Sequence, residues 1–141
     1  MSAIFTNLIL SMLLCSYALA ETEQCVSGQI RSLEFGKLIY EKSSYCFNSQ
    51  HNELISKNCF KSTCVATQSI KPFDIVKLNS VTGNPGFKLC RVLGGQPRII
   101  EFSDDTNWFK LDQCTFNEDH SFVDTGTLTF LVRKKTPSDT K

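Results

Sequence analysis

Apolar and polar residues alternate over short stretches of the first half of the chain, and this pattern predicts β-strands rather than helices. We predict strands over residues 25–33, 38–47, 54–57, 64–68 and 73–78. The turn at 34–37 joins the first two strands, and the polar stretch 48–53 forms a loop. This half is therefore expected to be a small antiparallel meander.

The pattern changes at Asn84, after which a short helix is predicted over residues 85–93. Asn84 is a good N-cap residue, and Pro85 suits the first helical position because its missing N–H would have no partner there. Gly94 and Gly95 end the helix. Three apolar side chains recur along one side of it, at i, i+3 and i+6: Phe87, Cys90 and Leu93.

Three further strands are predicted after the helix, over residues 97–102, 108–116 and 121–132. The tail 133–141 is predicted to be disordered. The expected fold class is α+β: mostly antiparallel β, with one short helix packed on a three-stranded C-terminal meander. We therefore divide the mature chain into a cysteine-rich β-meander region, 21–80, and a helix-plus-meander domain, 81–132.

The first twenty residues are almost wholly apolar and predict a cleaved signal peptide. The small residues before Glu21, the first charged residue, place the cleavage after Ala20. An uncleaved membrane anchor is one alternative, but the run is short for a bilayer span and no basic anchor follows it. Lipidation of Cys15 is another, which the bulky residues before it disfavour. The protein is thus expected in the periplasm or outside the cell.

Removal of Cys15 with the signal leaves six of the seven cysteines, and an even number in an exported chain predicts three disulfides. The simplest pairing keeps each disulfide within one part of the chain, on either side of about residue 80. It joins Cys90 to Cys114 and leaves the four cysteines of the first part to pair among themselves. These four are Cys25, Cys46, Cys59 and Cys64. A zinc site is the competing interpretation, and it is disfavoured because no CxxC or HxxxH pair accompanies the Cys59–Cys64 spacing.

Composition narrows the class of protein further. The chain has 141 residues, 41% of them hydrophobic and eleven of them phenylalanine, which argues against intrinsic disorder. A formal charge of +1 argues against nucleic-acid binding, which needs a strongly basic face. The length suits one ordinary domain or two very small ones.

Spaced residues of the second half resemble a bacterial family. In order, they are Asn84-Pro85, Cys90, Gly94-Gly95, Cys114-Thr115-Phe116 and Asp119-His120-Ser121. This order is similar to the pattern of the DUF333 domain, which is often labelled a hemolysin, and the likeness covers about residues 84–128. The resemblance implies an exported bacterial envelope protein with a small disulfide-stapled fold. Membrane lysis rests on the label alone, because the mature chain has no membrane-active stretch longer than a strand.

Three positions depart from the family pattern. His120 stands where the family has Gly, Val123 where it commonly has a further Cys, and Gly126 where it has Trp. The family's second disulfide is therefore expected to be absent from this chain.

Candidate catalytic and metal-binding residues are few, and we predict a non-enzymatic protein without cofactor or metal. His51 and His120, the only histidines, lie in polar loops, where a solvated histidine is commoner than a general base. Acidic residues gather in turns without the spacing of a calcium loop, and we interpret them as turn formers. They are Glu101, Asp104, Asp105, Glu118, Asp119 and Asp124.

The leading hypothesis is an exported bacterial module that binds an unidentified protein partner, with no nucleic acid and no stable membrane insertion. Loops 50–58 and 103–108 are the candidate display loops. Trp108 and Phe109 are a candidate aromatic anchor, although burial in the core is the commoner role of such residues. The run 133–135, Arg-Lys-Lys, is interpreted as a strand edge protected against aggregation rather than as a site.

Two other functions stay open. The first is a secreted peptidase inhibitor that presents Lys61 in the loop between Cys59 and Cys64. The second is a hemolysin-like, membrane-active protein. Inhibition of a peptidase or release of dye from liposomes would separate them from a binding module.

Overall fold

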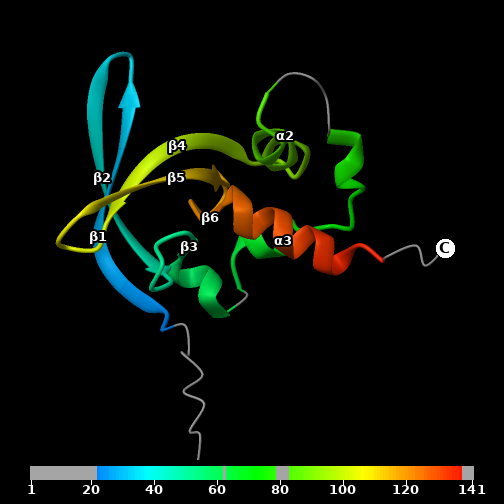
Figure 1. Ribbon diagram of the computed structural model, residues 1–141, viewed down its shortest axis with the longest axis horizontal. Coiled ribbons are helices and arrows are strands. Elements are labelled where there is room, and N and C mark those ends of the chain that lie inside the picture. The colour runs from blue at the N-terminus through cyan, green and yellow to red at the C-terminus, as the bar shows by residue number, and fades with distance from the viewer. Residues whose placement is uncertain (1–21, 62, 79–82, 138–141) are drawn as a thin grey trace, which may run out of the picture.

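Six antiparallel strands close into one barrel in the computed structural model of the protein, which describes residues 22–61, 63–78 and 83–137. Neighbouring strands follow the order β1-β2-β3-β6-β5-β4 (Figure 1). The strands are β1 (Gln24–Glu34), β2 (Lys37–Phe47), β3 (Leu54–Ser56), β4 (Gln96–Ser103), β5 (Trp108–Thr115) and β6 (Phe122–Asp124). The helices are α1 (Val65–Gln68), α2 (Pro85–Val92) and α3 (Thr125–Lys135), with 3-10 turns η1 (Lys57–Lys61) and η2 (Ile75–Leu78).

The expectation of a mostly antiparallel β fold with disulfides is confirmed, and β1 to β5 lie close to their predicted ranges. The predicted signal peptide, 1–20, its cleavage after Ala20 and the alternative role of Cys15 lie outside the described residues. So do the last residues of the tail, 138–141.

The three C-terminal strands β4, β5 and β6 pair consecutively, as expected of a meander, but they form part of one closed barrel rather than a separate sheet. β1 pairs with β4 over Ile30–Ser32, and β3 pairs with β6 through Ile55 and Val123. Both seams join a strand of the predicted region 21–80 to a strand of 81–132, so the two regions share one sheet. Closure leaves no free edge where these strands pair, which is an alternative to protecting the edge with charges.

Three segments predicted as strands contain helix instead. Residues 64–68 contain α1, residues 73–78 contain η2, and residues 121–132 form only the short β6 before α3 begins. Asp74 shows the local reason in η2, because its Oδ1 accepts the N–H of Val76 at 3.1 Å. Such side-chain bonds to the backbone favour turns and helix starts over strands.

α3 shows how tertiary packing reverses a strand pattern. Asp124 caps the helix by accepting the N–H of Thr127 at 2.8 Å. Leu128 and Val132, four residues apart, are fully buried, so one helix face packs on the core and outweighs the β propensity of the threonines. The basic run 133–135, predicted to lie in a disordered tail, forms the last turn of α3, where cations complement the helix dipole.

α2 and the disulfides follow the predictions closely. Asn84 caps α2 by accepting the N–H of Gly86 at 2.8 Å, and Pro85 is its first residue. Cys90 of α2 is bonded to Cys114 of β5, the strand between β4 and β6. The other four cysteines pair among themselves, as Cys25–Cys46 and Cys59–Cys64.

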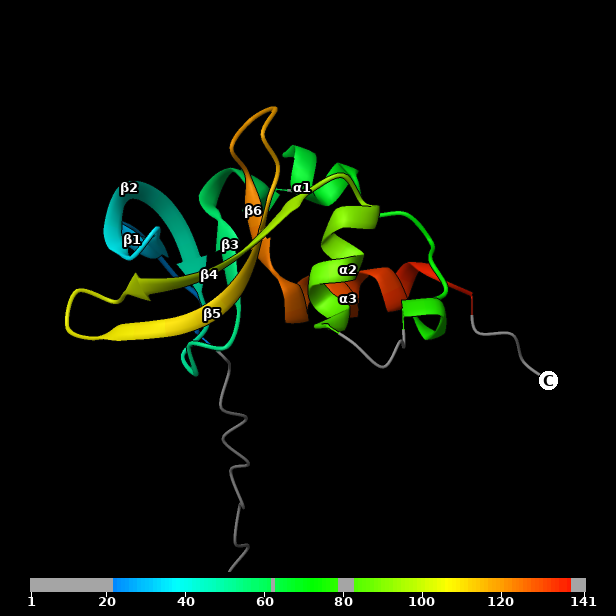
Figure 2. The ribbon, with the colours of Figure 1, turned by 90° about the horizontal axis from the view of Figure 1, so that it is seen from above.

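The buried residues form two hydrophobic cores. One fills the barrel and includes Tyr45, Phe47 and Phe102. The other lies between the barrel wall and the helices, where Leu89 of α2 and Leu128 of α3 join the Cys90–Cys114 disulfide. Figure 2 shows these helices on one side of the barrel and the β1–β2 hairpin on the other. The far end of that hairpin belongs to neither core.

Candidate functional site

The far end of the β1–β2 hairpin exposes a cluster of apolar side chains. The two strands pair along their whole length, and the end of the hairpin beyond Ser32 stands clear of the other strands (Figure 1). Five large apolar residues are exposed there: Leu33, Phe35, Leu38, Ile39 and Tyr40. Leu33 keeps 69% of its surface exposed, and Phe35 is fully exposed. We call these five residues the apolar tip. The remaining exposed large apolar residues of the described chain are scattered over other elements.

The turn that ends the hairpin is strained. Phe35 and Gly36 lie between the paired residues Glu34 and Lys37, with φ of +49° and +77°. Two consecutive positive φ values define a type I′ turn, whose first position favours asparagine or aspartate. A phenylalanine is unfavourable there because its Cβ crowds the backbone. Since the Phe35 side chain is fully exposed, no burial offsets this strain.

The charges around the tip are unevenly paired. Arg98 of β4 binds Glu41 at 3.1 Å and Glu34 at 3.4 Å, so the two acidic residues of the hairpin end share one cation. Lys37 and Lys42 of the hairpin take part in no ion pair with the described residues. Glu34 lies opposite Lys37 across the hairpin, so Lys37, Lys42 and Arg98 together exceed the two acidic residues by a single positive charge beside the apolar tip.

A groove opens beside the tip. β1 and β4 diverge after the Ser32–Ile100 pair, and the space between them has a volume of about 610 Å³. Leu33 and Leu38 of the tip line it together with Phe87 of α2. The groove thus extends the apolar surface of the hairpin toward the barrel.

The two residues of the predicted aromatic anchor, Trp108 and Phe109, lie in different environments. Trp108 lies half-buried at the base of the hairpin, with the Arg31 guanidinium 4.1 Å from its ring centre and the Tyr40 ring edge-on at 6.1 Å. Phe109 packs against the barrel core and stacks on His51 at 3.8 Å. Trp108 supports the hairpin, and Phe109 closes the barrel interior.

The two predicted display loops contact each other. His51, from loop 50–58, places its Nε2 3.0 Å from the Asp104 carboxylate of loop 103–108. Backbone N–H groups of Asn107 and Thr106 bind the same carboxylate and, with His51, lower the pKa of Asp104 against a smaller opposing effect of burial. Among the described residues the hydrogen bonds give His51 no hydroxyl or thiol partner, and the six described cysteines are in disulfides. The His51–Asp104 pair therefore joins the two loops and does not have the geometry of a nucleophile with its general base.

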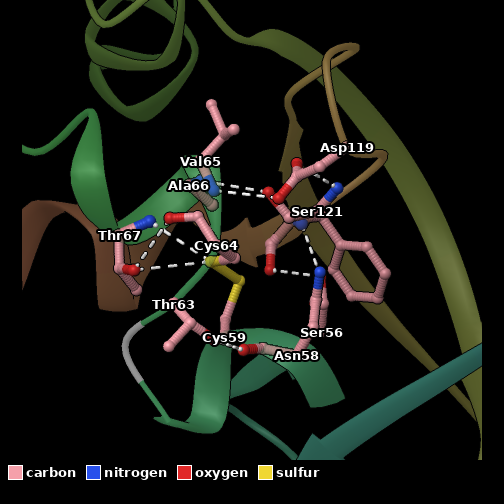
Figure 3. Close-up of a disulfide and its surroundings, with 11 residues drawn as sticks. Ser56, Asn58, Cys59, Thr63, Cys64, Val65, Ala66, Thr67, Asp119 and Ser121 are labelled. Atoms are coloured by element: carbon pink, nitrogen blue, oxygen red, sulfur yellow. Dashed lines mark hydrogen bonds between the residues drawn. A yellow bond between two sulfur atoms is a disulfide. The ribbon is translucent and has the colours of Figure 1, made fainter.

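Asp119 and Ser121, two residues of the DUF333-like pattern, hold the start of α1 (Figure 3). The Asp119 carboxylate accepts the N–H of Val65 at 2.9 Å, and Ser121 Oγ accepts the N–H of Ala66 at 3.0 Å. Burial alone would raise the pKa of Asp119. Hydrogen bonds from Ser121 and from the Val65 backbone outweigh it and lower that pKa. These residues therefore have a structural role, and they lie beside the Cys59–Cys64 disulfide that holds the same segment.

The remaining candidates are dispersed. Glu101 pairs with Arg31, and Asp124 accepts the N–H of Leu54 at 2.9 Å. Over the described residues, no group of three or more His, Cys, Asp or Glu side chains could hold a metal ion. Lys61 is the last residue of η1, so its backbone is in a 3-10 turn, and its side chain lies outside what the structure describes. His120 is exposed in a turn, at φ +55°.

Comparison with known proteins finds no match: no family model, no curated protein and no solved structure corresponds to this chain. The likeness to DUF333 therefore rests on the spaced residues themselves. None of the helices in the described parts of the chain is long and apolar enough to cross a bilayer.

The apolar tip was not among the sequence-based candidates, although the sequence carries a signal for it. Phe35-Gly36 lies between two predicted strands, where a two-residue hairpin turn usually has asparagine before the glycine. Alternation alone could not separate Leu33, Leu38 and Tyr40 from core residues, because their exposure depends on where the neighbouring strand ends.

Proposed function

We propose that this protein is an exported, non-enzymatic binding protein whose binding surface is the apolar tip of the β1–β2 hairpin. The observation that carries the proposal is Phe35, a fully exposed aromatic side chain at a backbone position that disfavours it. Local strain of this kind is typical of functional sites. A clustered apolar surface on an otherwise polar exterior is typical of interaction sites.

Export is supported by the apolar N-terminus with its cleavage site and by the three disulfides, which are consistent with an extracellular or oxidising compartment. The resemblance to DUF333 supports a bacterial envelope. The proposal assigns the His51–Asp104 pair a structural role, because it joins the two loops to each other.

The inhibitor alternative would present Lys61 to a peptidase. Substrate-like inhibition needs an extended segment, whereas the backbone at Lys61 belongs to the 3-10 turn η1. No specific observation favours that loop over the hairpin, and we base the proposal on the hairpin.

Photocrosslinking tests the proposed surface. A benzophenone side chain replaces Phe35 in one variant and Phe130 in the other, because Phe130 of α3 is also exposed, at 63%, and lies on a different element. Both oxidised proteins are illuminated with an envelope fraction, and the adducts are analysed for protein and lipid. We expect adducts from position 35 and few from position 130. Equal adducts from both positions, or none from position 35, would contradict the proposal.

A further inference from the structure

We propose that the apolar tip is a peripheral membrane anchor, which inserts into the headgroup region of a bilayer containing anionic phospholipid. The inference rests on the proposed function and names the partner of that surface. It concerns reversible attachment of the folded protein and neither a spanning segment nor a pore.

The distribution of the apolar residues around the hairpin supports a bilayer over a protein pocket. Leu33 and Leu38 are cross-strand partners and share one face, and Ile39, partner of Ser32, lies on the opposite face. Phe35 extends from the end. A protein partner that packs against one face leaves the other in water. A bilayer surrounds the tip, so both faces leave water together.

The charges support an anionic surface. Lys37 follows the turn directly, opposite Glu34 in the hairpin, and Lys42 lies farther along β2; neither lysine forms an ion pair with a described residue. The nearby acidic residues, Glu34 and Glu41, are bound by Arg98 instead. The hairpin end keeps a net charge of +1 over Lys37, Lys42, Arg98, Glu34 and Glu41, and basic residues next to an inserted apolar segment are attracted to anionic headgroups.

The dimensions agree with an interfacial position. Tyr40 lies three residues beyond Lys37 on β2, about 10 Å along an extended strand. Amphipathic segments at the interface bury their apolar side by about 5–10 Å. Phe35 at the end of the hairpin would then reach the acyl boundary, while Lys37 and Tyr40 lie at headgroup level, where tyrosine is enriched.

Sedimentation with vesicles tests the inference on the oxidised mature protein. One set of vesicles is pure phosphatidylcholine, and the other contains about one third phosphatidylglycerol. We expect binding to the anionic set to exceed binding to the neutral set by at least tenfold and to weaken at 0.5 M salt, because the headgroup attraction is screened. Phe35→Asn should reduce binding about tenfold or more, and Lys37→Gln with Lys42→Gln several-fold.

Two controls separate insertion from misfolding. Asparagine suits the turn position, so Phe35→Asn should fold at least as well as the natural chain. Phe130→Ser removes an exposed phenylalanine far from the hairpin and should leave binding within about twofold.

The depth of insertion is measured with Phe35→Trp in a Trp108→Phe background, which removes the single natural tryptophan. Its emission should shift to the blue with anionic vesicles and be quenched by brominated acyl chains.

The outcomes distinguish the inference from the proposed function. Protein adducts from position 35 without vesicle binding would overturn the membrane anchor and keep the hairpin as a binding surface. Vesicle binding that survives Phe35→Asn unchanged would show that another surface binds the membrane and would overturn the anchor; adducts from position 35 then decide the proposed function separately. Binding of equal strength to neutral and anionic vesicles would overturn the role of the lysines.

Discussion

The Asp119 carboxylate accepts a 2.9 Å hydrogen bond from the backbone N–H of Val65, a residue 54 positions earlier in the chain. In the same way, Ser121 Oγ accepts a 3.0 Å hydrogen bond from the backbone N–H of Ala66. Together they fasten the start of α1 to the turn before β6, so two segments far apart in the chain are held to each other.

Replacement of Asp119 should loosen this connection. Asp119→Ala removes the acceptors for Val65 and for the N–H of Ser121, and we expect a loss of about 1–3 kcal/mol in the free energy of unfolding. Urea unfolding at pH 7 measures it. Glu118→Ala changes an exposed neighbour and should be nearly neutral. Equal effects of the two variants would show that the Asp119 bonds do not stabilise the fold.

Acid should destabilise the protein through the same residue and Asp104. Hydrogen bonds from Asn107 and Thr106 lower the pKa of Asp104, and those from Ser121 and Val65 outweigh burial and lower the pKa of Asp119. A carboxyl whose folded-state pKa is depressed stabilises the fold fully above its unfolded pKa of about 3.9 and loses that contribution as the pH falls through the folded value. The urea concentration at the unfolding midpoint should therefore decrease once the pH is lowered below about 4. In the double variant Asp104→Asn/Asp119→Asn this midpoint should be lower than in the natural protein at pH 7 and should change less with acid.

The disulfides that close the longest and the shortest loop should differ in their effect on stability. Cys90–Cys114 closes a separation of 24 residues and Cys59–Cys64 one of 5. The loop-entropy relation then predicts losses of about 3.4 and about 2 kcal/mol when each pair is replaced by alanine. Chemical unfolding of the two double variants measures the difference. A larger loss for the short loop would mean that buried contacts, rather than loop entropy, dominate the effect.

A side chain at Gly95 should destabilise the fold. A Cβ there would contact the sulfurs of Cys90 and Cys114 and the ring of Phe116. Gly95→Ala is therefore expected to destabilise by about 1–3 kcal/mol through overpacking. Gly94→Ala is the matched control, since its Cβ meets nothing within 4 Å and only the positive φ of 88° opposes it. Its loss should be about 1 kcal/mol, and the order of the two is tested by thermal unfolding.

Phe35→Asn should make the protein more stable while weakening its binding. Phe35 contributes no burial and has a φ of +49°, which asparagine adopts more readily. We expect a gain of about 1 kcal/mol from relief of strain. Urea unfolding checks this, and Phe130→Ser shows what loss of an exposed phenylalanine does elsewhere. A loss of stability would mean that the turn needs the phenylalanine ring.

Local sequence signals predicted much of the fold. Asn84 and Pro85 started α2 where expected, and the Cys90–Cys114 pairing followed from the even number of mature cysteines and their positions. The same local logic failed from Thr125 onward, where threonines and valine suggested a strand. Asp124 as an N-cap, with Leu128 and Val132 four residues apart, was the signal that favoured the helix.

The candidate site was less predictable. His51 and Asp104 were named separately, in two loops expected to be free, and only the barrel brings them within 3.0 Å. The apolar tip was missed because exposure is a property of the assembled sheet. Leu33 lies one residue beyond the last pair between β1 and β4, and no pattern within β1 indicates where that pairing stops.

The sequence by itself determined the strands β1, β2, β4 and β5, the limits of α2 and the set of cysteines available for pairing, because each depends on neighbours within a few positions. Only the tertiary structure decided that the strands close into one barrel, that residues 125–135 are helical, and that Phe35 is exposed while Phe47 and Phe102 are buried. These outcomes depend on contacts between residues far apart in the chain. The free energy of burying a side chain is set by what packs against it, and its residue type alone does not specify that.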